Sequence, residues 1–172
     1  GPLNAGQLTV NAGHLVVTDE LLADWISVNT SGAGGSLTTT THGLTSADGS
    51  ALTASLSLTN GEVRLRGGHA ITANEGYVWL QGVDSQLVDA DTHTSILAQL
   101  STNSGDIYLF DGATVHGGAT TFTNTGTVGL LNHSRWTGLQ HFVNDGGLSG
   151  HLSIDADSEL AAASFHLASG TL

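Results

Sequence analysis

Paired carboxylates are the side chains of this sequence best suited to chemistry. Asp89 and Asp91 lie two residues apart, as do Asp155 and Asp157. On a β-strand this spacing places both carboxylates on one face, where they could share acid and base roles in polysaccharide cleavage or bind Ca²⁺. Carboxylates in solvated turns have the same spacing, and the Gly-Gly-x-Gly-x-Asp repeat of calcium-binding β-rolls is missing. We favour the turn interpretation and expect no catalytic residue, no metal site and no cofactor.

Imidazole groups recur along the chain at nearly regular intervals. Six of the nine histidines are separated by 23 to 27 residues, namely His42, His69, His93, His116, His141 and His166. A column of metal ligands would keep a constant offset from the neighbouring glycine motifs, whereas here the offset drifts from eight to eleven residues. We therefore interpret the histidines as scattered surface residues. The segment Asp48-Gly49-Ser50 likewise lacks the setting of a serine-protease nucleophile.

Aromatic side chains beside arginine form the binding site that the sequence predicts. In alternating segments the aliphatic residues face the interior, so their neighbours face outward. This phase exposes three aromatic residues and one arginine that together make the predicted ligand site: Tyr77, Trp79, Tyr108 and Arg64. Exposed rings beside a guanidinium can stack on sugar rings or anchor a protein partner. The alternatives are that a loop covers these side chains, or that they lie on different faces.

The charge composition excludes several classes of partner. The chain has 15 acids against three cations, Arg64, Arg66 and Arg135, and its net charge is −12. Binding to nucleic acid requires clustered Lys and Arg, and an anionic membrane surface would repel this chain. No Cys is present, and no apolar run of about 20 residues could cross a bilayer as a helix. We expect no nucleic-acid partner and no direct membrane insertion by this segment.

A short motif recurs through the chain and predicts its architecture. Asn is followed two residues later by Gly and then by two aliphatic residues at alternate positions, in copies that begin at Asn4, Asn11, Asn74, Asn103 and Asn124. A contracted copy begins with Asn60-Gly61, and a partial copy contains Asn144, Gly146 and Leu148. Asn and Gly tolerate the positive φ angles of tight corners. The alternating aliphatic residues predict a short strand with one buried face.

The spacing of these motifs predicts stacked coils. Gly105 to Gly126 is 21 residues and Gly126 to Gly150 is 24, which suits one coil per step. Because 39% of the residues are hydrophobic, the chain can bury an interior as one segment spanning residues 1–172. We predict an all-β, right-handed parallel β-helix (β-solenoid) of about seven coils. Residues 18–26 fit either a short helix, near residues 19–26, or a strand with Trp25 in the core.

Two of these segments resemble a known group of bacterial surface proteins. Asn-Thr-Gly-Thr-Val-Gly-Leu at 124–130 and Ser-Gly-Asp-Ile-Tyr-Leu at 104–109 are similar to coil repeats of Gram-negative autotransporter passengers and of filamentous-haemagglutinin-like, two-partner adhesins. The Cys-free composition, rich in Thr, Asn and Gly, is similar too. The resemblance implies a β-helical shaft outside the outer membrane that serves adhesion, aggregation or biofilm formation. It supplies no matched functional residues.

We expect an adhesive or self-associating shaft segment, secreted or displayed at the cell surface of a Gram-negative bacterium. Its partner would be a host-surface protein or glycan, or another copy of the chain. One alternative is a polysaccharide-binding or -cleaving β-helix domain, similar to a phage tailspike or a lyase, with acids and aromatic rings in one groove. Another is a passive spacer without a ligand. Gly1-Pro2 resembles a protease-cleavage scar, and we expect the rest to be a fragment of a longer secreted protein.

Overall fold

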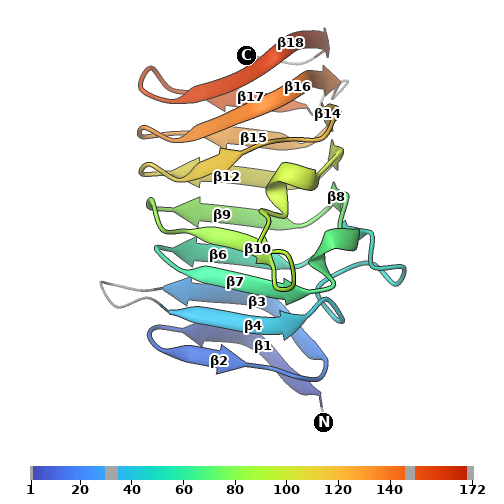
Figure 1. Ribbon diagram of the computed structural model, residues 1–172, viewed down its shortest axis with the longest axis vertical. Coiled ribbons are helices and arrows are strands. Elements are labelled where there is room, and N and C mark those ends of the chain that lie inside the picture. The colour runs from blue at the N-terminus through green and yellow to red at the C-terminus, as the bar shows by residue number, and fades with distance from the viewer. Residues whose placement is uncertain (1, 30–34, 146–149, 170–172) are drawn as a thin grey trace.

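Stacked parallel strands form most of the regular structure of this protein. The computed structural model describes residues 2–29, 35–145 and 150–169, and the strands within these ranges pair in parallel throughout their sheets. They stack along the long axis of the molecule, from strand β1 (Leu3–Val10) at one end to strand β18 (Glu159–Ser169) at the other (Figure 1). The predicted all-β parallel β-helix is confirmed. Gly1, Gly146 and Leu148, which contribute to the sequence patterns above, lie outside the described residues.

The strands belong to three sheets that run along this axis. In the described chain, sheet A contains β1 (Leu3–Val10), β3 (Leu21–Asn29), β6 (Ser55–Thr59), β9 (Tyr77–Gln81), β12 (Asp106–Phe110), β15 (Thr127–Leu130) and β17 (His151–Ile154). Sheet B contains β2 (His14–Val16), β4 (Ser36–Thr40), β7 (Glu62–Arg66) and β10 (Gln86–Asp89). Sheet C contains β5 (Ala51–Leu52), β8 (Ala73–Asn74), β11 (Thr102–Asn103), β13 (Thr114–His116), β14 (Thr121–Asn124), β16 (Arg135–Asp145) and β18 (Glu159–Ser169).

The coils that begin at β3, β6 and β9 pass through sheets A, B and C in turn, whereas the coil that begins at β12 continues through β13 and β14, both in sheet C. From β6 in sheet A the chain continues to β7 in sheet B and β8 in sheet C, and β9 then returns it to sheet A. The seven strands that sheet A has within the described residues agree with the prediction of about seven coils. Near the C-terminus the long strand β16 pairs with both β13 and β14. A single strand there replaces two shorter strands of the preceding coil.

Columns of aliphatic side chains fill the interior. The register of sheet A aligns one inward position on six consecutive strands, occupied by Ile26, Leu56, Val78, Ile107, Val128 and Leu152. None of these side chains is more than 3% exposed. On the sheet C side, Phe122 stacks on Phe142 with ring centroids 5.7 Å apart and meets Trp136 edge-on. Burial of this apolar surface drives folding. The buried residues are those that the alternating segments predict to face inward, so this prediction is confirmed.

Four of the repeated Asn residues mark the corner between sheet C and sheet A, and for these four the positive φ predicted from the sequence is wrong. Asn74, Asn103, Asn124 and Asn144 are at most 2% exposed, and none of them has a positive φ. Each Nδ2 of the first three donates instead to the Oδ1 of the next Asn in the row, at 2.7 Å. We call these four stacked amides the asparagine ladder. Buried polar groups require such partners, and the ladder supplies them along the row, except at its first member, where Oδ1 of Asn74 has no hydrogen-bond partner among the described residues.

The glycine two residues after each of the first three ladder positions permits close stacking of the coils. A Cβ on Gly105 would lie 2.0 Å from the carbonyl oxygen of Gly76, and a Cβ on Gly126 would lie 2.0 Å from that of Gly105. Positive φ angles occur in other copies of the motif, at Asn60 (50°) and Gly13 (79°). At the ladder, therefore, glycine is needed for the close approach of another backbone.

Residues 21–29 form strand β3, so the helix expected near residues 19–26 is wrong. Ile26 and Val28 are buried, whereas Trp25 lies on the outer face and is 36% exposed. The alternative was a strand with Trp25 in the core. The strand is correct, but the position of Trp25 in the core is wrong. Helical structure in the described ranges consists of two short 3₁₀ turns, η1 (Gly68–Ala70) and η2 (Leu97–Gln99). In the described ranges, no helix is long and apolar enough to cross a membrane.

Candidate functional site

Five aromatic rings meet on the outer face of sheet A. We call them the aromatic platform: Trp25 from β3, Tyr77 and Trp79 from β9, and Tyr108 and Phe110 from β12. Trp79 stacks on Phe110 with ring centroids 4.1 Å apart. The ring centroid of Tyr77 lies 5.5 Å from that of Trp25 and 6.0 Å from that of Tyr108. Trp25 is exposed and the other four residues are half-buried, so part of the platform remains open to solvent.

Sheet register and a missing side chain produce this arrangement. β9 and β12 pair with Trp79 directly opposite Tyr108, so rings from adjacent coils come into contact. The next position in the same row is Gly129, where a Cβ would lie 2.5 Å from Cδ1 of Tyr108. Glycine therefore allows the Tyr108 ring to lean over β15. Ring contacts of this kind contribute about 0.5–1.5 kcal/mol each beyond the burial of their surface.

The charge next to the platform is negative. Asp106 lies opposite Tyr77 in the register of β9 and β12. Burial raises the pKa of Tyr77, and the neighbouring Tyr108 and Asp106 raise it further. The Tyr77 phenol is therefore neutral near pH 7 and can donate a hydrogen bond to a ligand.

Arg64 does not join these rings, so this part of the predicted site is wrong. It lies on β7 in sheet B, where its Nε donates to Oε2 of Glu62 at 2.8 Å. This hydrogen bond and the charge of Glu62 raise the pKa of Arg64. Of the four predicted site residues, the structure brings together Tyr77, Trp79 and Tyr108.

Two members of the platform, Trp25 and Phe110, are not among the four residues of the predicted site, although alternation along residues 106–110 places Phe110 on the outer face. Phe110 continues the alternation of β12 and faces outward like Tyr108. The apolar spacing around Trp25 predicts a helix or a position in the core, and both predictions are wrong for this side chain. The inward pair Ile26 and Val28 was the signal that could have placed Trp25 on the outer face.

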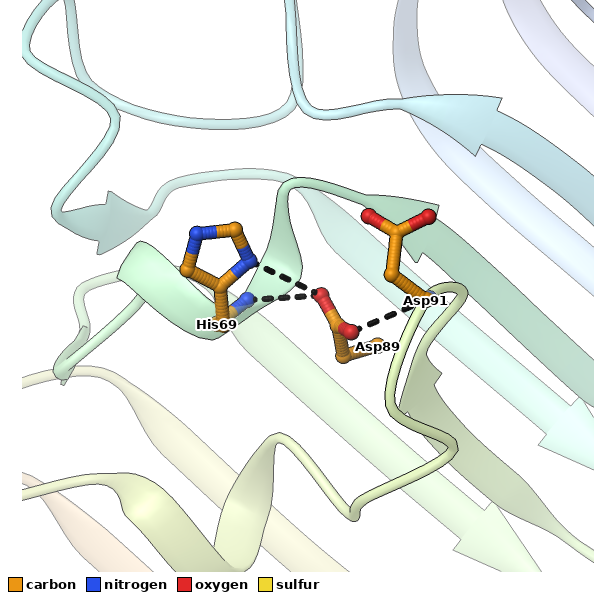
Figure 2. A group of neighbouring side chains, drawn as sticks. All are labelled: His69, Asp89 and Asp91. Carbon is orange, nitrogen blue, oxygen red and sulfur yellow. Dashed lines mark hydrogen bonds and ion pairs between the residues drawn. The ribbon is translucent and has the colours of Figure 1, made fainter.

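A second cluster surrounds the buried carboxylate of Asp89 (Figure 2). His69 and Asp91 each offer a potential ligand atom, and these atoms and one from Asp89 lie within 4.8 Å of one another. The Asp89 oxygens are already bonded, however. Oδ1 accepts the backbone N–H groups of Asp91 and Thr92 and the Thr92 hydroxyl, and Oδ2 accepts the backbone N–H of His69 at 2.8 Å. These four hydrogen bonds fit a structural role, because they connect the turn after β10 to η1.

Asp89→Asn should destabilise the fold in a pH-dependent way. Burial alone would raise the pKa of Asp89, but hydrogen bonds from Thr92, His69 and Asp91 outweigh burial and lower it to about 2. The ionised carboxylate therefore stabilises the fold above the unfolded pKa of about 3.9, and this contribution disappears as pH falls towards 2. We expect a loss of about 1–3 kcal/mol at pH 7 that shrinks by pH 2.5, measured by thermal unfolding followed by circular dichroism.

Asp91→Asn is the matched control, because Asp91 is exposed and contributes its backbone N–H to the network. This variant should unfold at nearly the wild-type temperature at both pH values. If Asp89→Asn lost as much stability at pH 2.5 as at pH 7, the ionised carboxylate would not be the stabilising group.

The second acidic pair lies in a turn, as the favoured interpretation predicted. Asp155 and Asp157 follow β17 and precede β18. Hydrogen bonds from the Ser158 side chain and from the backbone N–H of Asn132, the latter at 2.5 Å, lower the pKa of Asp155. This carboxylate stays ionised near neutral pH and is not suited to donating a proton there.

The evenly spaced histidines do not stack in the strands where register can be followed. Ser164 lies opposite His141, and Thr137 lies opposite His116. The Nδ1 of each histidine forms a hydrogen bond with the hydroxyl of that neighbour, at 2.5 Å and 3.0 Å respectively. These two imidazoles are surface groups beside hydroxyls, in agreement with the sequence interpretation.

Acids and aromatic rings do not share either of two clefts found among the described residues. One cleft, of about 600 Å³, is lined by residues that include Glu20, His42 and Asp48. The other, of about 260 Å³, is lined by residues that include Val88, His93 and Val115. No ring of the aromatic platform lines either cleft. Hydrogen bonds from Ser46 and Ser50 lower the pKa of Asp48 to about 2, which does not suit a general acid near neutral pH.

The aromatic platform differs from the other ring contacts of the described chain by its position. Phe122, Trp136, Phe142 and Phe165 contact one another along the inward side of sheet C, whereas the platform lies on the outer face of sheet A. No protein-family model, no curated protein and no solved structure matches this chain.

Proposed function

We propose that this chain is a shaft segment of a secreted or surface-displayed adhesin of a Gram-negative bacterium, and that the aromatic platform contacts the partner. The observation that supports this is the clustering of five partly exposed rings on one outer face. Single exposed apolar residues are ordinary, whereas contiguous apolar patches mark binding surfaces. The partner in this proposal is a protein or glycan on a host cell surface.

Charge favours a host partner over a second copy of the chain. Each copy has a net charge of −12, so side-by-side association would bring two strongly negative surfaces together. A polysaccharide-cleaving site would gather acids and rings in one groove, and the clefts described above contain none of the platform rings. A passive spacer would have no ligand, and this alternative is separated by experiment.

Trp79→Ala should weaken adhesion with little effect on the fold. Trp79 contacts three rings of the platform, Tyr77, Tyr108 and Phe110, but it lies outside the core. We expect beads coated with the variant to bind epithelial cells at least about tenfold less than wild-type beads, which corresponds to about 1.4 kcal/mol. The Tm, followed by circular dichroism, should fall by up to about 10 °C because three ring contacts are lost, and the variant should remain folded at the temperature of the assay.

Val83→Ala provides the control, because Val83 is 65% exposed and does not belong to the platform. Beads coated with this variant should bind like wild-type beads. Equal binding by wild type and Trp79→Ala would contradict the proposal. Binding no stronger than that of uncoated beads would favour the spacer.

A further inference from the structure

A strip of small hydroxyl side chains borders the aromatic platform. Strand β6 lies between β3 and β9, and its outward residues are Ser55, Ser57 and Thr59. Ser57 lies in register between Ser27 on β3 and Trp79 on β9. Because neighbouring strands are about 4.8 Å apart, Trp79 and Ser27 are separated by roughly twice that distance. We call Ser27, Ser57 and Thr59 the hydroxyl strip.

The indole of Trp79 has surface available on the side of this strip. Phe110 is its nearest ring partner, with centroids 4.1 Å apart, and Phe110 belongs to β12 on the opposite side of β9, whereas the nearly parallel ring of Tyr77, on β9 itself, is 6.5 Å away. Towards β6 the neighbours in register are Ser57 and then Ser27, which are too short to cover an indole. Trp79 is accordingly only half-buried.

The hydroxyls of the strip are available to a ligand. Ser27, Ser57 and Thr59 are partly exposed, and their side chains form no hydrogen bond with another residue of the described chain. Asn29, at the exposed end of β3, lies in register with Thr59 and adds an amide. The result is a half-exposed aromatic surface beside a short row of unused donors and acceptors.

The geometry points to a neutral glycan built of pyranose units as the ligand of this surface. A pyranose presents a face of C–H groups and an edge of hydroxyls. The C–H face suits packing against an aromatic ring, and the hydroxyl edge suits hydrogen bonds to Ser57, Thr59 and Asn29. Binding sites for small polar molecules generally combine such an apolar wall with a few placed polar groups. This inference rests on the proposed function, because it assigns the ligand class of the same platform.

Charge selects against acidic glycans. The three cations of the chain lie on other sheets, Arg64 and Arg66 on β7 and Arg135 on β16. On the platform side the nearest charge in register is the carboxylate of Asp106, opposite Tyr77. A sulfated, sialylated or uronic-acid chain would find no cation here and would approach against a net charge of −12.

Ser57→Leu tests this inference without removing any ring. The leucine would fill the strip beside Trp79 and remove a hydroxyl, while the outward position of Ser57 leaves the core unchanged. Wild-type protein should bind at least one of immobilised cellohexaose, maltohexaose and mannohexaose, and bind hexagalacturonate and heparin hexasaccharide at least about tenfold more weakly. Ser57→Leu should lose at least about tenfold in binding to the neutral oligosaccharide. Ser153→Leu, in the same outward row on β17, should bind like wild type.

The bead assay distinguishes failure of the glycan assignment from failure of the proposed function. Periodate oxidation of the target cells should abolish adhesion, and sialidase treatment should leave it intact. Adhesion that depends on Trp79 but survives periodate would overturn the glycan assignment and leave an adhesin for a protein. Preference for the acidic oligosaccharides, or full neutral-glycan binding by Ser57→Leu, would also overturn it. Adhesion that does not depend on Trp79 would refute the proposed function itself.

Discussion

Asn103→Asp should lower the Tm by about 10 °C at pH 7, although the two side chains have the same shape. Asn103 is fully buried, and its Nδ2 donates to Oδ1 of Asn124 at 2.7 Å and to the carbonyl oxygens of Gly105 and Thr127, each at 3.0 Å. A carboxylate oxygen in that place would face three acceptors without a proton. Leaving a buried charge without its partners costs about 3–5 kcal/mol.

The pH dependence identifies the cause of this loss. Burial and the surrounding acceptors would raise the pKa of the introduced carboxyl above its unfolded value of about 3.9. The neutral form can donate one hydrogen bond, so the variant should be closest to wild type at low pH. The deficit should then grow as pH rises through the raised pKa. Thermal unfolding between pH 4 and pH 8 checks this, and a deficit of constant size would contradict the ladder as its origin.

Two further variants separate charge from position. Asn29→Asp introduces the same charge at an exposed strand end and should leave the Tm nearly unchanged. Asn103→Leu removes the ladder link without adding a charge. Leu52 already occupies this row one coil before Asn74, so a leucine fits the row. Its cost should be smaller than that of Asn103→Asp and independent of pH.

The in/out phase of the strands could be predicted from sequence because it depends on a local rule. Side chains alternate along a strand, so the inward positions Val78, Ile107 and Val128 follow from the hydrophobic pattern alone. The role of the repeated Asn depends on residues in other coils. The hydrogen bonds of the ladder join residues 20 to 29 positions apart, and the coil lengths vary. An Asn that caps a corner and an Asn that stacks on another Asn have the same local sequence.

The candidate site was predicted only in part, because alternation is a local rule and the path of the chain between sheets is not. Alternation correctly placed Tyr77, Trp79 and Tyr108 outside, but it gives a side of the strand and not the sheet to which the strand belongs. Arg64 follows the positive-φ residue Asn60, after which the chain leaves sheet A and enters sheet B. The resulting separation of Arg64 from the rings is set by the path of the coil, which a local pattern does not contain.

Val128→Asp should be at least as damaging as the change at the ladder, and it tests the phase of a complete coil. Val128 faces the interior and is 0% exposed to solvent, with Ile107 and Leu152 directly opposite on the adjacent strands. A carboxylate here would have apolar neighbours in both coils and no hydrogen-bond partner in register. We expect a loss of about 4 kcal/mol or more, seen as a lower Tm and as earlier urea unfolding followed by circular dichroism.

Thr127→Asp places the same carboxylate one residue earlier, where the side chain faces outward. Its neighbours in register are Asp106 on one side and His151 on the other. Repulsion from Asp106 at the surface should cost less than about 1 kcal/mol, because water and salt screen exposed charges. Thr127→Asn, which has no charge, measures that repulsion separately. The two aspartate substitutions should therefore differ by several kcal/mol although they are adjacent in sequence. Equal loss of stability in both variants would mean that Val128 does not face the interior. The assignment of Val128 to the buried column of sheet A would then be wrong.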